Sequence, residues 1–275
     1  MGGNTNRTPQ DSDLLVPFEI ASISKEYLEY YKIRRNNFFA SIQQFPSMWK
    51  YFMLLDRIWL RGFEDLNVAS APERMFPLLL YINAHAKLRI AIELAFSGCL
   101  AEARSILRDG IEFVAHAHSM LTDPTLQKVW LSKNDGRPDL EAFRDAFERN
   151  KKTNAFRGLD ELHKAWGDLS ETGSHANINA LIDRFEIQET ATHVEYKIRY
   201  TGVAPDFWEK SIFLLLQFCT LMEAILFRDY NTRLNLDVNL VRMREEAALL
   251  WADVSKNLIA KHNLKPPPAP LIHMP

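Results

Sequence analysis

The chain has 275 residues and a formal net charge of −2, with 47% hydrophobic and 25% charged residues. This is an ordinary globular composition with enough apolar residues for a core. The near-neutral charge argues against a strongly basic surface for nucleic acid or acidic membranes, and the densest basic cluster is Lys32, Arg34 and Arg35. Cys99 and Cys219 lie in apolar helical patterns and predict no disulfide framework, so we expect a cytoplasmic protein.

The sequence predicts one domain with a tail at each end. Residues 1–17 and the proline-rich residues 264–275 have few apolar anchors and predict disordered tails. Residues 18–263 show no internal repeat and no linker, so we expect a single helical domain there. No stretch resembles a secretory signal, and no apolar run is both long and uncharged enough to indicate a membrane span, so we expect no membrane partner.

Helical periodicity of the apolar residues runs through most of the chain. The expected helices cover residues 19–44, 47–66, 78–96, 99–121, 139–152, 159–181, 205–229 and 238–261, with a short helix within 123–131. Apolar and polar residues alternate over much of 184–200, which predicts a β-hairpin. The predicted fold class is therefore all-α: a single bundle of about seven to nine helices with a small β-hairpin insertion near 184–200.

Prolines and a glycine mark the expected helix ends in the first half of the chain. Pro46 should end the first helix, Pro77 should kink the segment that leads into residues 78–96, and Gly98 should form a left-handed turn to the next helix. Residues 78–96 are apolar nearly all the way round, which predicts a helix buried on all sides. Charged residues in such a helix need partners or a water-filled pocket.

Polar residues form four rows at helical spacing inside helices that should be buried. In the first two rows the spacing of four residues places the members on one face of a helix. The rows are His85, Arg89 and Glu93; Arg104, Arg108, Glu112 and His116; Ser170, Glu171 and His175; and Gln217 and Glu223. If these helices are neighbours, the rows could meet in one pocket that holds a small phosphate-bearing or other anionic ligand.

Such a pocket predicts a role for individual members of the rows. The candidate ligand-binding residues are Arg89, Glu93, Arg104, Arg108 and Glu223. The candidate catalytic residues are His175 as proton shuttle, with Ser170 and Glu112. The alternative is a non-enzymatic interaction or regulatory module, whose buried charges only form an ion-pair network that fixes which helices pair.

Motifs of three enzyme classes are absent from the sequence. Glu112 with His116, and Glu171 with His175, have the spacing of paired metal ligands, but the Glu-x-x-His of carboxylate-bridged di-metal bundles does not occur. The nucleophile elbow of serine hydrolases and a Gly-rich phosphate loop do not occur either. We therefore expect no metal and no cofactor, while an enzyme and a binding module both stay open.

One pattern resembles known families. Arg108-x-x-x-Glu112, followed about sixty positions later by Leu169-Ser170 and then His175, resembles uncharacterised bacterial all-α families that are loosely similar to the HEPN group of helical nucleases and nucleotide-binding domains. The resemblance covers about residues 78–227.

The resemblance implies a further alternative function. HEPN ribonucleases carry an Arg and, within two turns of the same helix, a His that together cut RNA across a dimer. Arg157 and His163 have this spacing. The resemblance therefore implies a HEPN-like ribonuclease of a toxin or defence system, with RNA as partner. A homodimer could form through the aromatic-rich helices expected at residues 19–44 and 47–66.

Overall fold

The computed structural model describes residues 23–65, 72–174, 185–190, 192–198, 201, 205–230 and 238–264. These ranges contain nine α-helices, and the predicted all-α bundle is confirmed. The helices are α1 (Lys25–Gln44), α2 (Pro46–Asp65), α3 (Met75–Phe96), α4 (Leu100–Thr122), α5 (Thr125–Leu131), α6 (Arg137–Phe143), α7 (Asp160–Leu169), α9 (Pro205–Tyr230) and α10 (Val238–His262). The predicted tails lie outside the described residues, except for Leu264.

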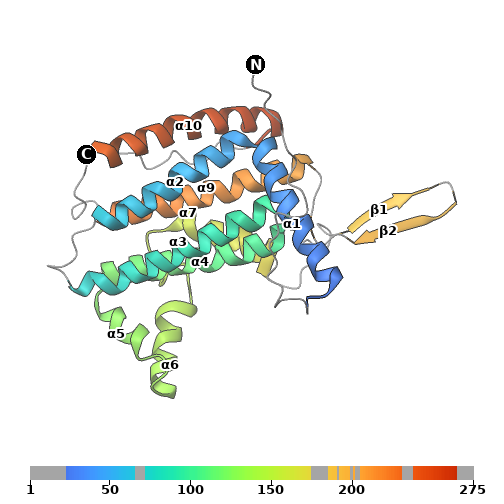
Figure 1. Ribbon diagram of the computed structural model, residues 1–275. Coiled ribbons are helices and arrows are strands. Elements are labelled where there is room, and N and C mark those ends of the chain that lie inside the picture. Colours follow the sequence, from blue (N-terminus) through green and yellow to red (C-terminus); the bar gives the residue numbers. More distant parts are fainter. Residues whose placement is uncertain are drawn as a thin grey trace.

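The helix α9 lies at the centre of the bundle. It contacts α2, α3, α4, α7 and α10, and Figure 1 shows these long helices in layers from α10 through α2 and α9 to α3 and α4. Within the described ranges, α9 is long and apolar enough to cross a membrane by length and composition, but 61% of its most apolar window is buried inside the protein. That burial suits the core helix of a bundle.

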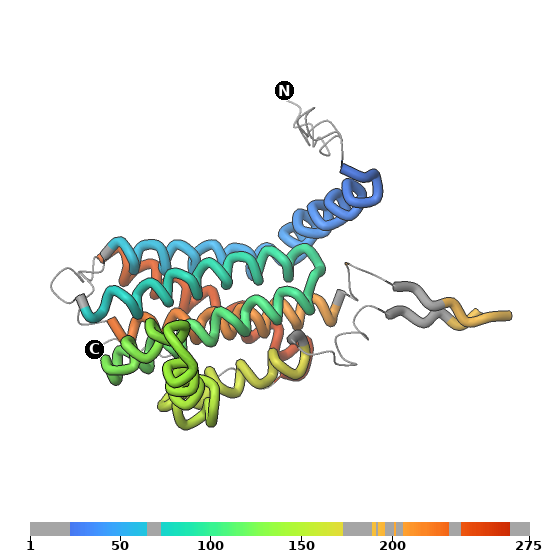
Figure 2. Tube along the Cα trace, turned by 90° about the horizontal axis from the view of Figure 1, so that it is seen from below, coloured from blue at the N-terminus to red at the C-terminus, as the bar shows by residue number. Residues whose placement is uncertain are grey.

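Two elements point away from the long helices of the bundle. Figure 2 shows α1 extending away at an angle, and the hairpin of β1 (Phe185–Glu189) and β2 (Val194–Ile198) projecting from the same end. The two strands pair antiparallel, with Ile187 opposite Tyr196, so the predicted hairpin is present. The helix α1 contacts α2 and α3 and leaves much of its surface exposed.

The two prolines take positions at helix starts. Pro46 opens α2 directly after the end of α1, as a residue without an N–H can at the first position of a helix. A 3₁₀ turn over Pro72–Arg74 precedes α3, which begins at Met75, so Pro77 lies in the first turn of the helix. N–H groups in that turn have no helical partner, so Pro77 removes no hydrogen bond from α3.

Two positions in the bundle have a structural reason to be glycine. Gly98 has a φ of 80°, which confirms the predicted left-handed turn between α3 and α4. Gly110 lies where three helices approach closely, since a Cβ there would be 3.3 Å from Cβ of Lys87 in α3 and 3.3 Å from Cε of Met222 in α9. The pair α3 and α4 thus packs directly on the central helix.

Two predicted helices consist of an α-helix followed by a π-helical turn, and residues 175–181 of the second prediction lie outside the described residues. The helix expected at 139–152 is α6 followed by a π-helical turn over Arg144–Glu148. The helix expected at 159–181 is α7 followed by a π-helical turn over Ser170–Ser174, after which the described residues end. The helix α3 also departs from its prediction, because Leu79, Ile82 and Ile90 are exposed. Its expected burial on all sides is wrong: α3 lies at the edge of the bundle, where one face has no helical neighbour among the described residues.

Candidate functional site

The polar rows lie in three separate clusters, each held together by residues from other helices. The first, the Asp56 cluster, contains Asp56, His85 and Arg89. The second, the Trp166 cluster, contains Arg108, Glu112, Lys151, Trp166 and Ser170. The third is the ion pair of Glu223 with Arg244. The structure therefore distributes the rows over the bundle and does not bring them into one pocket.

In the Asp56 cluster a buried carboxylate joins α2 to α3. Asp56 is 8% exposed, and its Oδ1 and Oδ2 accept hydrogen bonds from Nε and Nη2 of Arg89 at 2.6 and 2.8 Å. Nε2 of His85 lies 2.8 Å from Oδ1, and the His85 ring stacks on Trp59 with 5.2 Å between ring centres. Burial alone would raise the pKa of Asp56, but the hydrogen bonds from Arg89 and His85 outweigh it and hold this pKa well below its usual range.

We expect Asp56→Asn to lower the free energy of unfolding by about 2 kcal/mol, because a two-pronged charge-assisted contact is lost while Arg89, whose side chain is half exposed, keeps part of its hydration. Equilibrium urea unfolding at neutral pH measures this loss. The matched control is Glu64→Gln on the same helix, whose side chain is 67% exposed and which should change stability by less than about 0.5 kcal/mol. Equal effects of the two substitutions would contradict the prediction.

In the Trp166 cluster one carboxylate oxygen is fully occupied. Oε1 of Glu112 accepts hydrogen bonds from Nζ of Lys151 and Nε1 of Trp166, both at 2.7 Å, and from Nη2 of Arg108 at 3.2 Å. Burial raises the pKa of Glu112, but the bonds from Lys151 and Trp166 and the charge of Arg108 outweigh this effect, so the pKa is lowered. Glu112 is therefore an ionised hub between α4 and α7, which suits a structural role better than a proton-transfer role.

The other two catalytic candidates are Ser170, which belongs to this cluster, and His175. Oγ of Ser170 accepts a hydrogen bond from Nε of Arg108 and donates one to the carbonyl oxygen of Trp166, both at 2.8 Å. These bonds hold the hydroxyl against its own helix. His175 lies outside the described residues, so its proximity to Ser170 stays a prediction.

The remaining predicted residues pair within the bundle. Glu223 of α9 forms an ion pair with Arg244 of α10, and both side chains are nearly buried. Burial raises the pKa of Glu223 even though the Arg244 guanidinium opposes this shift. Nη2 of Arg104 donates to Oγ of Ser211 at 3.2 Å, and its guanidinium lies 5.5 Å from the ring centre of Phe207.

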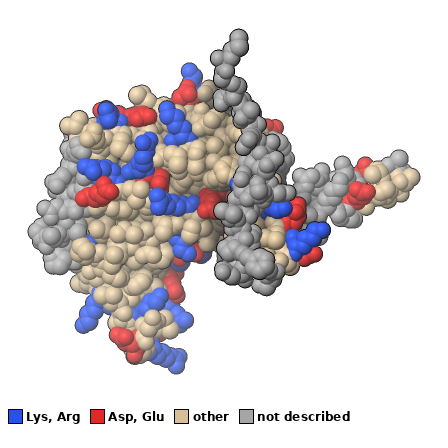
Figure 3. Space-filling model, in the orientation of Figure 1, with Lys and Arg blue, Asp and Glu red and all other residues tan. Residues whose placement is uncertain are grey.

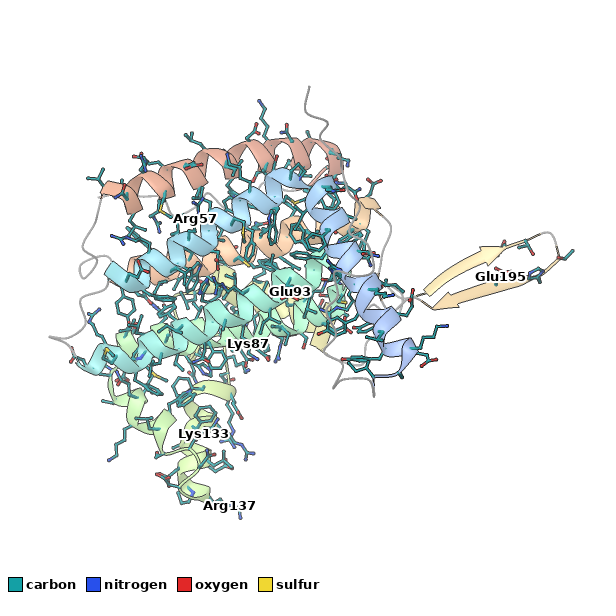
Figure 4. The ribbon with its side chains drawn as sticks, in the orientation of Figure 1. Arg57, Lys87, Glu93, Lys133, Arg137 and Glu195 are labelled. Carbon is teal, nitrogen blue, oxygen red and sulfur yellow. The ribbon has the colours of Figure 1, made fainter. Side chains whose placement is uncertain are left out.

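A groove of about 670 Å³ opens where α1 crosses α2 and α3; we call it the Arg34 groove. Its lining combines three arginines, two carboxylates, five aromatic rings, one methionine and one serine. The lining residues are Tyr31, Arg34, Arg35, Phe38, Phe39, Trp49, Phe52, Met53, Asp56, Arg89, Glu93 and Ser97. Of the predicted ligand-binding residues, this groove brings together Arg89 and Glu93, and Figure 4 shows Glu93 on α3 near the crossing with α1.

The arginines of the Arg34 groove are only partly neutralised. Arg89 is committed to Asp56, whereas Nη2 of Arg34 lies 4.0 Å from Oε1 of Glu93, a loose contact. The Nε of Arg34 is buried and makes no hydrogen bond within the described part of the chain. The guanidinium of Arg35 lies 5.7 Å from the ring centre of Phe39. The groove thus has hydrogen-bond donors and positive charge to offer an anion.

The opposite part of the Arg34 groove is aromatic. Phe38 packs edge-on against Trp49 with 5.3 Å between ring centres, and Trp49 lies 5.5 Å from Phe52. Aromatic faces next to guanidinium groups bind a flat or apolar group that carries negative charge. The chemistry of the groove is therefore recognition of an anion with an apolar body.

Sequence reasoning missed Asp56 and gave Arg34 and Arg35 no role. The signal for Asp56 is a carboxylate inside the apolar run of residues 51–59, where a charge needs a partner. Lys32, Arg34 and Arg35 stand out as a basic cluster, but only the angle of α1 against α2 and α3 turns two of them into a groove lining.

A second missed network joins α3, α4 and α9. Asp229 accepts a hydrogen bond from the Tyr81 hydroxyl at 2.6 Å and lies 2.9 Å from Nδ1 of His118. His118 had no predicted role and instead has a structural partner. The signal available in the sequence was only an acidic residue near the end of a predicted apolar helix.

The Arg and His with ribonuclease spacing do not share a helix. Arg157 lies in the turn before α7, and its Nε donates to the carbonyl oxygen of Thr153 at 3.2 Å. His163 lies on α7 with its ring between Phe156 and Trp166, at 5.2 and 6.0 Å between ring centres.

Among the residues that the structure describes, no three His, Cys, Asp or Glu side chains come close enough together to hold a metal ion. Comparison of the chain with protein-family models, with curated proteins and with solved structures gives no match. Inferences about function therefore depend on the geometry of the Arg34 groove.

Proposed function

We propose that the protein binds a small phosphate-bearing anion with an aromatic group, such as a nucleotide, in the Arg34 groove. The observation that carries the proposal is Arg34, which lines a groove of about 670 Å³ and whose buried Nε has no hydrogen-bond partner in the described residues. Ligand pockets of small molecules have volumes of roughly 300–1,000 Å³. Arg34 and Arg35 would bind the phosphate, and Trp49 and its aromatic neighbours would hold the ring.

The Asp56 cluster restrains one arginine of the proposed site. Arg89 is held by two hydrogen bonds to Asp56, so its guanidinium has little freedom to lose when an anion approaches. Half of the Arg89 side chain is exposed at the groove. A preorganised arginine beside two less restrained ones suits recognition of an anion by several donors.

The alternative, that charges only specify helix pairing, is favoured for the other two clusters. Glu112 is saturated by three donors, and Glu223 is closed off by Arg244. Glu223 and Arg244 line a cavity of only about 30 Å³, which is far smaller than a ligand pocket. We therefore place ligand binding in the Arg34 groove, and we treat the Trp166 cluster and the Glu223 pair as structural.

We expect Arg34→Ala and Arg35→Ala each to weaken binding of the ligand about tenfold or more, since a charge-assisted hydrogen bond contributes about 1.5–3 kcal/mol. The probes are inorganic phosphate, pyrophosphate, nucleoside mono- and triphosphates and a short single-stranded RNA. Thermal shift identifies a probe that stabilises the wild type, and calorimetry then gives its dissociation constant for each variant.

The matched control is Arg57→Ala, an arginine exposed on α2 that does not line the groove (Figure 4). This variant should bind like the wild type. If no probe shifts the wild type, or if Arg57→Ala weakens binding as much as Arg34→Ala does, the proposal is wrong. Binding of RNA with a steep dependence on salt, but no binding of mononucleotides, would point to an extended strand as the ligand.

A further inference from the structure

The outer face of α3 carries a continuous row of apolar side chains that none of the described helices covers. Its members follow at alternating steps of four and three residues, the spacing of a helix that packs along a second helix. The row consists of Met75, Leu79, Ile82 and Ala86, with Ile90 beside it. The four large side chains are exposed to 43, 48, 41 and 48%. Figure 3 shows an area without charged side chains over α3.

We propose that this face of α3 binds the same face of a second copy of the chain, in an antiparallel homodimer with its two-fold axis near Ile82. A two-fold interface pairs one surface patch with itself, so the patch must complement itself. With the axis near Ile82, the large Leu79 faces the small Ala86 of the second copy, and Met75 faces Ile90. The apolar row is self-complementary in this register.

The charges at the two ends of the row favour the antiparallel arrangement. Glu73 and Arg74 precede the row, and Arg89 and Glu93 follow it. Antiparallel pairing brings the exposed Glu73 within about one helical turn of Arg89 of the second copy, whose side chain is half exposed. A parallel pairing would instead place each of these residues beside its own copy, with like charges together.

The length of the row sets the expected affinity. The stretch from Met75 to Ile90 covers roughly 24 Å along the helix axis, at about 1.5 Å per residue. A single pair of helices of this length buries less than the roughly 1,200 Å² of a tight interface. We therefore expect a concentration-dependent dimer with a dissociation constant in the micromolar range.

Sedimentation velocity from low to high micromolar concentration tests the dimer. The wild type should shift from monomer to dimer, and Ile82→Glu should stay monomeric because it buries two like charges at the axis. Leu249→Glu is the matched control, since Leu249 is 75% exposed on α10, and it should dimerise like the wild type. Circular dichroism and thermal melting show that each variant is folded.

Cross-linking tests the register. Two copies of Ile82→Cys should form a disulfide under mild oxidation, whereas Leu249→Cys should not. The native Cys99 and Cys219 are 3% and 0% exposed and do not compete. A monomeric wild type at high micromolar concentration, or a dimer that Ile82→Glu leaves intact, would overturn the proposal and leave this face to a different occupant. Both results concern the oligomeric state, whereas the Arg34 groove, whose lining includes Arg89 and Glu93, is tested by ligand binding.

Discussion

Replacing Arg244 with methionine is expected to lower the free energy of unfolding at neutral pH by about 3–5 kcal/mol, the largest effect of any single substitution considered. The reason is that Glu223 stays behind in the core with its charge unpaired. The guanidinium of Arg244 also lies 3.6 Å from the ring centre of Phe227, so its removal costs packing as well. Urea unfolding at neutral pH measures the loss.

The double variant Glu223→Gln/Arg244→Met identifies the cause. It removes both charges, so we expect it to recover most of the stability that Arg244→Met loses. The single variant should also recover relative to the wild type as the pH falls, because its buried carboxyl folds in the protonated form. Lys50→Met is the control: its ion pair with Glu246 joins α10 to α2 instead of α9 and is exposed, and we expect a change below about 0.5 kcal/mol. A double variant no more stable than Arg244→Met would refute this account.

The helices could be predicted because their signals are local. The apolar spacing within each of α2, α4, α9 and α10 reflects one buried face, and that spacing does not depend on which helix packs against it. The turn at Gly98 is local in the same sense, since its positive φ is a property of the residue itself. Pattern and propensity therefore located these elements to within a few residues.

The partners of the charged rows could not be predicted, because they are chosen by the packing of the bundle. Arg89 pairs with Asp56, thirty-three positions earlier, and Glu223 pairs with Arg244 on the next helix. The four-residue spacing of the first two rows places their members on one face of a helix, but it carries no information on which helix lies opposite. The expected common pocket needed four helix faces to converge, and the structure brings together members of only two rows, Arg108 and Glu112 with Ser170.

The exposed row on α3 shows the limit of hydropathy as a signal. A residue such as Ile82 has the same hydropathy whether it packs in the core or lies on a surface that binds a partner. Residues 78–96 were expected to be buried on all sides because the sequence cannot separate the two cases. If the dimer exists, the expectation of burial holds for the assembly, and the error lies only in assigning it to one chain.

The pH dependence of stability is expected to depend on His116, which no functional proposal uses. Burial against Phe143, Phe147 and Trp130 lowers the pKa of His116 to about 4, although Glu112 opposes this shift. Lys151 and Lys133 add to the lowering. The folded protein therefore holds this imidazole neutral, whereas in the unfolded chain it binds a proton near its ordinary pKa of 6.5.

Whether stability rises or falls with pH depends on which state, folded or unfolded, binds more protons. Between pH 6.5 and 4 the unfolded chain is protonated at His116 and the folded protein is not, so stability falls as the pH falls. The loss from this residue reaches about 3 kcal/mol at pH 4. His116→Asn should remove that slope while keeping a polar group near Nε1 of Trp130. Urea unfolding between pH 7 and 4 measures the effect.

A control variant and the different pH window of Asp56 separate the effect of His116 from the effects of other titrating groups. His193→Asn, in the exposed hairpin turn, should leave the pH profile unchanged. Asp56 contributes in a different window, because its lowered pKa makes it lose stability only as the pH falls below its ordinary value of 3.8. A wild-type profile that is flat from pH 6.5 to 4, or one that His116→Asn leaves as steep as before, would show that His116 is protonated in the folded protein and that the apolar cage around it is open to water.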